Sequence, residues 1–421
     1  MMPFAAPSRR SLLASGGALV GLSACGVKPV KTVNTSPFTR DGLARIEATL
    51  SDHVAKGSAP GLAALVRRRD ETHAWTLGTK TLGVDDPVRR DTPFRIASMT
   101  KAVTAAAAMM LVEAGKLRLD EPVDRLLPEL ADRRVLKTMA SPLDETVPAR
   151  RPITVDDVLT FRLGWGVVFE PTPIGQAVAD LPGFGMPNPA APFTTDTWLA
   201  RLSKLPLMAQ PGERWLYTAG SNVLGALIER ASGQTLDAFF DERIFGPLAM
   251  KDTGFVGPAD RLPTGYLKDD GKLTVYDPPA GAFSRKPAFP AGDSGLVSTV
   301  DDFGAFARFL TTGKTVDGYR LLSDASLRTM TTDQLTPEQR KDGELILGPY
   351  RGWGHIGVYV EPSPQGIPVG AYGWGGGFGT SWFNDPSRDL TVILMTQRFF
   401  DGPDEPPIHK DFWRAAIAAA A

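Results

Sequence analysis

Two residues that could carry covalent chemistry, Ser98 and Lys101, stand three positions apart in this 421-residue chain. Residues three apart on a helix share one face, so their side chains can touch. A serine hydroxyl is a weak nucleophile until a base removes its proton, and a desolvated lysine can act as that base or assist it. The spacing therefore predicts an activated serine. An N-cap serine followed by a lysine that reaches solvent is the structural alternative.

The stretch around this pair predicts a buried helix. Residues 102–112 are almost wholly apolar, and a helix that is apolar on all sides belongs inside a domain. Pro93 precedes the stretch and Gly115 is a natural stop, so we expect a helix within residues 94–115. Ser98 would then lie near the helix N-terminus, where free backbone N–H groups favour a developing oxyanion.

Two further segments carry residues that can complete such a site. Tyr217 stands at the end of a loop, just before a predicted helix, and a phenol beside an ammonium group can accept and return a proton. The run Gly373-Trp-Gly-Gly-Gly-Phe-Gly379 precedes a predicted strand. Glycines beside a strand let the backbone approach a ligand and can present N–H groups to an oxyanion.

Taken in order, these motifs resemble the serine β-lactamase-like superfamily, which holds class C β-lactamases, DD-peptidases and family VIII carboxylesterases. Ser98-Met-Thr-Lys101 matches the nucleophile motif, Tyr217 stands where that family has its tyrosine, and Trp374-Gly-Gly376 matches the esterase form of the Lys-Thr-Gly triplet. Three supporting stretches (153–162, 244–255 and 292–299) extend the resemblance over residues 40–400, in closest agreement with the esterase branch.

The resemblance implies a role for each motif. Ser98 would be the acylated nucleophile, with Lys101 and Tyr217 acting together as the general base. The oxyanion would rest on the backbone N–H groups of Ser98 and Gly377. The remaining substrate-binding positions that the motif implies are Trp374, Gly375 and Gly376.

Two departures from the superfamily pattern favour neutral substrates. Tyr217-Thr-Ala219 lacks the usual asparagine, and Trp374 replaces the lysine that faces a substrate carboxylate. An unpaired carboxylate in the complex would cost about 1.5–3 kcal/mol. Arg398 or Arg162 could restore the missing cation, so the substitutions favour esters without excluding β-lactams.

We therefore expect an enzyme that cleaves short-chain carboxylic esters through an acyl-enzyme on Ser98. The alternatives are a β-lactamase or DD-peptidase, and a catalytically silent relative that binds cell-wall fragments or a protein partner. An α/β-hydrolase fits poorly because no Gly-x-Ser-x-Gly elbow occurs. The four histidines are scattered, so neither a metal site nor a cofactor is expected, and a net charge of −1 gives no reason to expect nucleic-acid binding.

The elements that must position these residues predict a mixed α/β (α+β) fold, and the resemblance implies that it is of the β-lactamase/transpeptidase type. Strand patterns near both ends suggest one antiparallel sheet flanked by helices, with a helical subdomain inserted at about 120–290. The expected strands are 61–67, 72–78, 357–361, 370–374, 380–384 and 390–398. The expected helices outside the nucleophile segment are 41–56, 155–160, 195–203, 221–232, 235–245, 301–311 and 409–420.

The first residues predict export. Ser8-Arg-Arg-Ser-Leu-Leu resembles a twin-arginine signal, and residues 22–25 resemble a bacterial lipobox that ends at the single cysteine, Cys25. We expect residues 1–25 to be the signal, 26–40 a tether and 41–421 the hydrolase domain. Acylation of Cys25 would make the protein a periplasmic, membrane-anchored lipoprotein. A plain signal peptide cut near Ala24 is the alternative.

Overall fold

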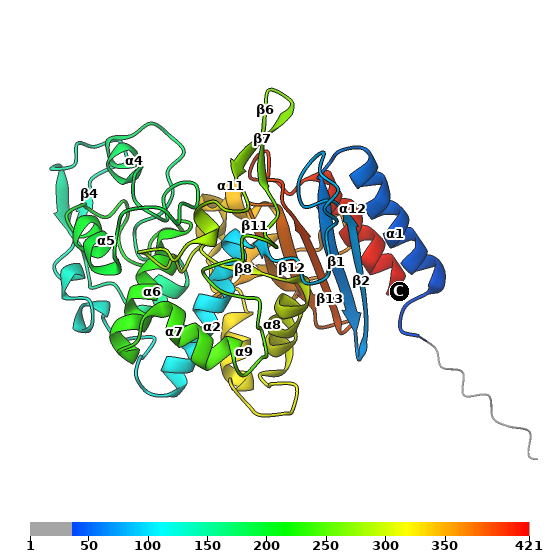
Figure 1. The fold of residues 1–421 in the computed structure, drawn as a ribbon. Coiled ribbons are helices and arrows are strands. Elements are labelled where there is room, and N and C mark those ends of the chain that lie inside the picture. The colour runs from blue at the N-terminus through cyan, green and yellow to red at the C-terminus, as the bar shows by residue number, and fades with distance from the viewer. Residues whose placement is uncertain (1–35, 421) are drawn as a thin grey trace, which may run out of the picture. The chain divides into compact units, whose positions relative to one another are not determined.

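The computed structural model describes residues 36–420 and is built around a seven-stranded antiparallel sheet (Figure 1). The strand order is β2-β1-β13-β12-β11-β10-β9. Cys25 and the predicted export signal lie outside the described residues, so lipidation and export stay predictions. Within the described residues, no helix combines the length and apolar character that crossing a bilayer requires.

Segments near the two ends of the chain pair within one sheet, as the sequence predicts. The N-terminal hairpin consists of β1 (Gly61–Arg68) and β2 (Glu71–Gly78). β1 also pairs with β13 (Leu390–Thr396), with Leu62 opposite Thr396 and Arg68 opposite Leu390. The antiparallel sheet from N- and C-terminal segments is thus confirmed.

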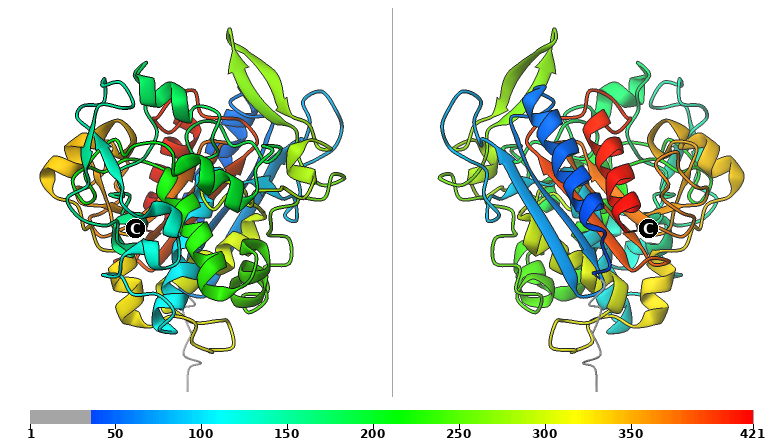
Figure 2. Two further views of the ribbon diagram at one scale, coloured as in Figure 1. Left: turned by 90° about the vertical axis from the view of Figure 1, so that its left-hand side faces the viewer. Right: turned by 90° about the vertical axis from the view of Figure 1, so that its right-hand side faces the viewer.

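Alternation along the strands explains why both faces of the sheet are covered. In β1, Leu62, Ala64 and Val66 belong to one apolar core, whereas Ala63 and Leu65 belong to another, since successive side chains point to opposite faces. The first core packs under α1 (Arg40–Ala55) and α12 (Pro407–Ala419), which lie side by side across the sheet (Figure 2). The second core packs under α8 (Val300–Thr312), which contacts β1 and β13.

The nucleophile segment differs from the single helix expected over 94–115. It begins as β3 (Phe94–Arg95), which pairs with β8 (Val297–Ser298), and continues as a 3₁₀ turn, η1 (Ala97–Met99). The regular helix α2 covers only Thr100–Glu113. Ala97 has φ of 41°, which ends the strand and prevents one continuous helix. Buried residues line α2 on all sides, as its composition predicts.

The region 120–290 contains the expected helices and also two short strand pairs. Its helices are α3 (Val155–Leu159), α4 (Pro173–Val178), α5 (Thr195–Leu202), α6 (Ala219–Ser232) and α7 (Leu236–Phe240), with a π turn at Asp241–Phe245. Its strand pairs are β4 (Arg134–Leu136) with β5 (Thr146–Pro148), and β6 (Gly265–Asp269) with β7 (Lys272–Asp277). Neither strand pair was predicted, because the region lacks sustained strand alternation, although Asp270-Gly271 at the turn of the second pair is a common hairpin signal.

Further elements complete the chain between α8 and α12. The remaining sheet strands are β9 (Arg351–Trp353), β10 (Gly357–Tyr359), β11 (Tyr372–Gly376) and β12 (Thr380–Asp385). Three short helices precede them: α9 (Asp324–Met330), α10 (Pro337–Asp342) and α11 (Glu344–Leu347). Single 3₁₀ turns occur at Val123–Arg125, Pro128–Leu130 and Ala282–Ser284.

Candidate active site

Ser98 lies in the 3₁₀ turn between β3 and α2, at the only half-buried position in that turn. Its neighbours Ala97 and Met99 are buried. The positive φ of Ala97 is unusual for a residue with a side chain, and such strained residues concentrate at functional sites. Ser98 is therefore the residue of this turn that solvent and a substrate can reach.

Lys101 is buried and held by oxygen atoms. Its side chain is 2% exposed, and its Nζ donates to Ser98 Oγ at 3.0 Å and to the Asp293 carbonyl oxygen at 2.8 Å. The predicted contact between serine and lysine is therefore present, and the snorkelling lysine of the structural alternative is not observed. A base within hydrogen-bonding distance of the hydroxyl is the geometry that nucleophile activation requires.

Asp293 is a buried acid within the stretch 292–299, and it was not predicted as a site residue. Its Oδ2 lies 4.0 Å from Lys101 Nζ and accepts a hydrogen bond from Thr218 Oγ1 at 3.0 Å. Its backbone N–H donates to Asn222 Oδ1 at 3.2 Å. Asp293 thus connects the lysine to the first turn of α6. Its position in a loop far from both partners in sequence explains why spacing alone did not reveal it.

Tyr217 precedes α6 and points its ring at the lysine. Lys101 Nζ lies 4.7 Å from the centroid of the Tyr217 ring, a cation–π distance. The hydroxyl of Tyr217 accepts a hydrogen bond of 2.6 Å from Trp374 Nε1. Because an indole N–H can only donate, Tyr217 Oη acts as the acceptor in this hydrogen bond.

The ring of Tyr217 is fixed by other aromatic side chains. Its centroid lies 5.6 Å from that of Trp215, in a stacked arrangement, and 5.7 Å from that of Trp374. Phe161 and Trp353 contact it at near-perpendicular angles. Both Phe161 and Thr218, which follows Tyr217, have positive φ, so backbone strain also marks this part of the site.

The glycines after Trp374 let β11 lie directly against the nucleophile turn. A side chain at Gly376 would collide with the carbonyl oxygen of Ile96, two residues before Ser98. Thr380 in β12 donates to the same carbonyl at 3.2 Å. In the described part of the chain, the backbone N–H groups of Ser98 and Gly377 donate no hydrogen bond, and both residues are half-buried. They remain available to a substrate.

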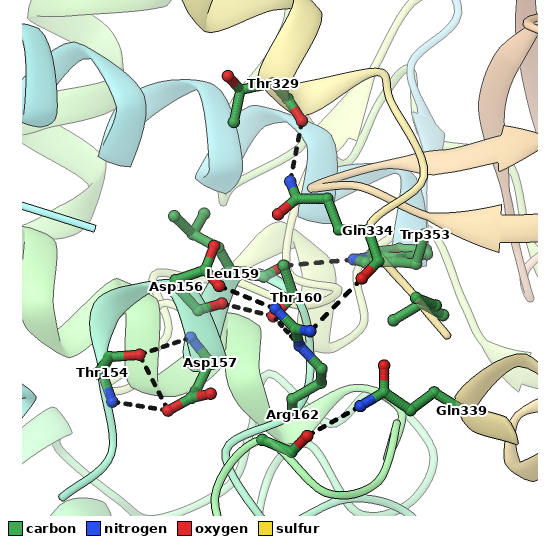
Figure 3. Close-up of polar contacts among 12 residues, drawn as sticks. Thr154, Asp156, Asp157, Leu159, Thr160, Arg162, Thr329, Gln334, Gln339 and Trp353 are labelled. Atoms are coloured by element: carbon green, nitrogen blue, oxygen red, sulfur yellow. Dashed lines mark hydrogen bonds and ion pairs between the residues drawn. The ribbon is translucent and has the colours of Figure 1, made fainter. Parts of the chain in front are cut away.

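The two arginines considered as replacements for the missing lysine are already paired. Arg398 binds Asp401, with Nη2 to Oδ1 at 2.6 Å. Arg162 binds Asp156 Oδ2 at 2.8 Å and Thr160 Oγ1 at 2.9 Å, within a network that joins the segment after α3 to the segment before α10 (Figure 3). Neither guanidinium is free to bind a substrate carboxylate.

The network in Figure 3 also supports the aromatic cluster. Trp353 Nε1 donates to the Leu159 carbonyl at 3.3 Å, and the Trp353 ring packs edge-on against Trp374 at 4.8 Å. Arg162 therefore has a structural role. It holds the end of α3 in place, and Trp353, which contacts Trp374 and Tyr217, is hydrogen-bonded to that end.

A pocket of about 470 Å³ opens beside Tyr217. Its wall is mainly apolar and includes Val168, Phe169 and Leu345, of which the last two are strongly exposed. Exposed apolar side chains around a concave site commonly bind apolar parts of a ligand. Among the residues that the structure describes, no group of histidine, cysteine or acidic side chains is arranged to hold a metal ion.

Comparison with known proteins gives matches over nearly the whole chain. A family model described as Beta-lactamase matches residues 46–413. Protein Rv1367c from Mycobacterium tuberculosis is 38% identical over 367 residues, covering 83% of this chain and 89% of that protein. Esterase EstB from Burkholderia gladioli is 31% identical over 391 residues, covering 86% of this chain and 92% of the esterase.

A solved structure also matches the fold. The protein described as "EstCE1, a hydrolase with promiscuous acyltransferase activity" superposes with a TM-score of 0.76 at 25% sequence identity. The match covers 90% of this chain and 98% of that protein. The expected mixed α/β fold is thus confirmed by an independent structure.

Proposed function

Because the chain belongs to the beta-lactamase family and is a serine hydrolase of that fold, we propose that it cleaves short-chain carboxylic esters through an acyl-enzyme on Ser98. One observation carries the choice of ester over β-lactam. Trp374 stands where the related motif has a lysine, and its indole donates a hydrogen bond to Tyr217. The position thus offers an apolar ring where a carboxylate-bearing substrate would need a cation.

In the proposed reaction, Lys101 and Tyr217 together take the proton of Ser98 as its Oγ attacks the ester carbonyl. The N–H groups of Ser98 and Gly377 bind the resulting oxyanion. Collapse of the tetrahedral intermediate breaks the ester C–O bond, and Tyr217 returns the proton to the departing alkoxide. A water molecule then attacks the acyl-enzyme by the same steps and releases the carboxylic acid.

Relatives support this choice of substrate class. One relative is named Esterase EstB, and a structural neighbour is described as a hydrolase with promiscuous acyltransferase activity. An acyl-enzyme can react with an alcohol in place of water, so transfer to an added alcohol fits the same mechanism. The apolar pocket beside Tyr217 suits the hydrocarbon part of an ester.

The test is hydrolysis of p-nitrophenyl acetate and butyrate by wild type and by Ser98→Ala. We expect release of p-nitrophenol that Ser98→Ala lowers by about 10³-fold or more. Equal rates for the two proteins would contradict the mechanism. Parallel incubation with a fluorescent penicillin separates the alternative, because covalent labelling together with poor ester turnover would favour a β-lactamase or DD-peptidase.

A further inference from the structure

A half-buried arginine lies behind the tryptophan that contacts Tyr217. The guanidinium carbon of Arg351, on β9, lies 4.8 Å from the centroid of the Trp374 ring, over its face. Its Nη1 pairs with Glu405 Oε1 at 2.8 Å, and the side chains of the pair are 12% and 14% exposed. Its Nε donates to the Leu347 carbonyl at 2.8 Å. The arginine is therefore fixed on the indole.

The arrangement makes a continuous path from this ion pair to the reacting groups. Glu405 contacts Arg351, which stacks on Trp374. The indole donates to Tyr217 Oη at 2.6 Å, and the Tyr217 ring faces Lys101. A cation over an aromatic ring draws electron density from it. The indole N–H then becomes a stronger hydrogen-bond donor, as in other polarised hydrogen-bond chains.

We propose that Arg351 is a positioning residue that acts through Trp374, favouring the phenolate of Tyr217 and thereby the proton transfer from Ser98. The inference rests on the proposed function for its catalytic consequence. Arg351 supplies positive charge behind the indole of Trp374, the residue that stands where the motif has its lysine. Glu405 pairs with the guanidinium on one side and Trp374 covers another. The cation therefore acts on the indole that it contacts and is not offered to a substrate carboxylate.

Electrostatics within the protein agree with this arrangement. Burial acts to lower the pKa of Arg351, but the Glu405 carboxylate, together with Tyr359 and Tyr217, raises it above its usual value. The guanidinium therefore stays charged at every working pH. The other charged groups near Tyr217 are Lys101 on α2, Asp293 before β8, and Glu170, Arg214 and Asp342 around the pocket.

Two substitutions with opposite expected signs test the proposal. Arg351→Met removes the cation, so the acidic limb of the profile of kcat/KM against pH should move to higher pH by about one unit. At pH values on that limb the rate should fall by roughly tenfold. Glu405→Gln leaves the cation without its counter-charge, so the same limb should move to lower pH. A purely structural role would lower kcat/KM for both variants and leave the midpoint of the limb in place, which would overturn the proposal.

Two controls refine the comparison. Arg351→Lys keeps the charge and should leave the limb near its wild-type position, which also covers the case in which Arg351→Met does not fold. In a Trp374→Phe background the indole N–H is absent, so Arg351→Met should shift the limb by much less than in the wild-type background. An undiminished shift there would show that the arginine does not act through Trp374.

A readout independent of turnover separates this proposal from the proposed function. Wild type and Tyr217→Phe are titrated with base while the ultraviolet absorbance of tyrosinate is recorded, and the difference between the two curves reports ionisation of Tyr217. When the same pair is compared in the Arg351→Met background, the midpoint of the difference curve should move to higher pH. If no ester is cleaved but the difference titration moves, the proposed function fails and the coupling stands. If esters are cleaved and the titration does not move, the coupling is overturned.

Discussion

Lys101 and Tyr217, the amine and the phenol of the site, are held in place by opposite kinds of contact. Lys101 is positioned by hydrogen bonds to two oxygen atoms, one of them on a residue three positions away. Tyr217 is positioned by aromatic rings from distant segments and by one hydrogen bond from Trp374. The lysine thus depends on polar contacts, one local and one from a distant loop, whereas the tyrosine depends on packing between the sheet and the inserted region.

Asp293 joins the two arrangements. Its carbonyl oxygen accepts from Lys101, and its carboxylate accepts from Thr218, next to Tyr217. A single buried residue therefore sets the separation of the amine and the phenol. Substitutions of Lys101, Tyr217, Asp293 and His355 are therefore expected to have effects of different size on activity and stability.

The largest effect is expected at Lys101. Lys101→Met keeps an unbranched buried side chain but removes the amine, so kcat for p-nitrophenyl butyrate should fall by about 10³-fold or more. Lys116→Met, at an exposed lysine after α2, is the matched control and should keep wild-type kcat. Retention of activity within tenfold in Lys101→Met would show that Tyr217 alone serves as the base.

A smaller effect is expected when only the hydroxyl of Tyr217 is removed. Tyr217→Phe keeps the ring contacts, so the melting temperature should stay close to that of wild type while kcat falls by about 10²-fold. Steady-state kinetics and thermal denaturation on the same preparation measure both. Tyr319→Phe, at a tyrosine that is 69% exposed, should change neither. A large loss of stability with little loss of kcat would assign Tyr217 to packing instead of proton transfer.

Loss of the Asp293 carboxylate, which lies between Lys101 and Thr218, should lower kcat by less than the substitutions above. Asp293→Asn keeps the size of the side chain and the backbone carbonyl that binds Lys101, but it removes the negative charge 4.0 Å from Nζ. We expect kcat to fall by roughly tenfold, since a hydrogen bond to a charged group contributes about 1.5–3 kcal/mol. Unchanged kcat and KM in this variant would limit Asp293 to its backbone contact.

The smallest effect on activity, with a clear effect on stability, is expected at His355, two residues after Trp353. Burial lowers the pKa of His355 to about 3, and neither ring nitrogen has a hydrogen-bond partner. The unfolded histidine titrates near 6.5, so the unfolded state binds more protons between these values, and stability falls as pH falls. The contribution is full above pH 6.5 and decreases by about 1.4 kcal/mol per pH unit below it.

Urea denaturation between pH 7 and pH 4.5 measures this dependence. His355→Leu should reduce the slope of unfolding free energy against pH. The slope should not vanish, because burial also lowers the pKa of His409 to about 3. An unchanged slope in His355→Leu would show that this histidine is not buried in its neutral form.

The parts of the site that follow from local sequence were predictable, and the parts that depend on distant packing were not. Ser98 and Lys101 are close because they stand three positions apart in a continuous helical segment, and Gly376 is required by close approach to Ile96. By contrast, Asp293 and Arg351 reach the site through loops and an edge strand whose placement no spacing reveals. Arg398 and Arg162 were considered as free cations, but the structure pairs both with aspartates.

The same division holds for the fold. The hairpin β1–β2 and the pairing partners β12 and β13 have strong strand patterns and form as expected. The nucleophile segment was predicted as one helix because its apolar composition gives no signal of a break. In the structure, the positive φ of Ala97 separates a strand from a 3₁₀ turn. That conformation is set by pairing of β3 with β8, about two hundred residues away in sequence.

The most direct test of the account is the identity of the nucleophile. Wild type and Ser98→Ala are incubated with a serine-directed p-nitrophenyl phosphonate, and intact-protein mass spectrometry is followed by peptide mapping. We expect one phosphonyl adduct on the wild-type protein, located on Ser98, and none on Ser98→Ala. An adduct on another residue, or equal labelling of the two proteins, would contradict it.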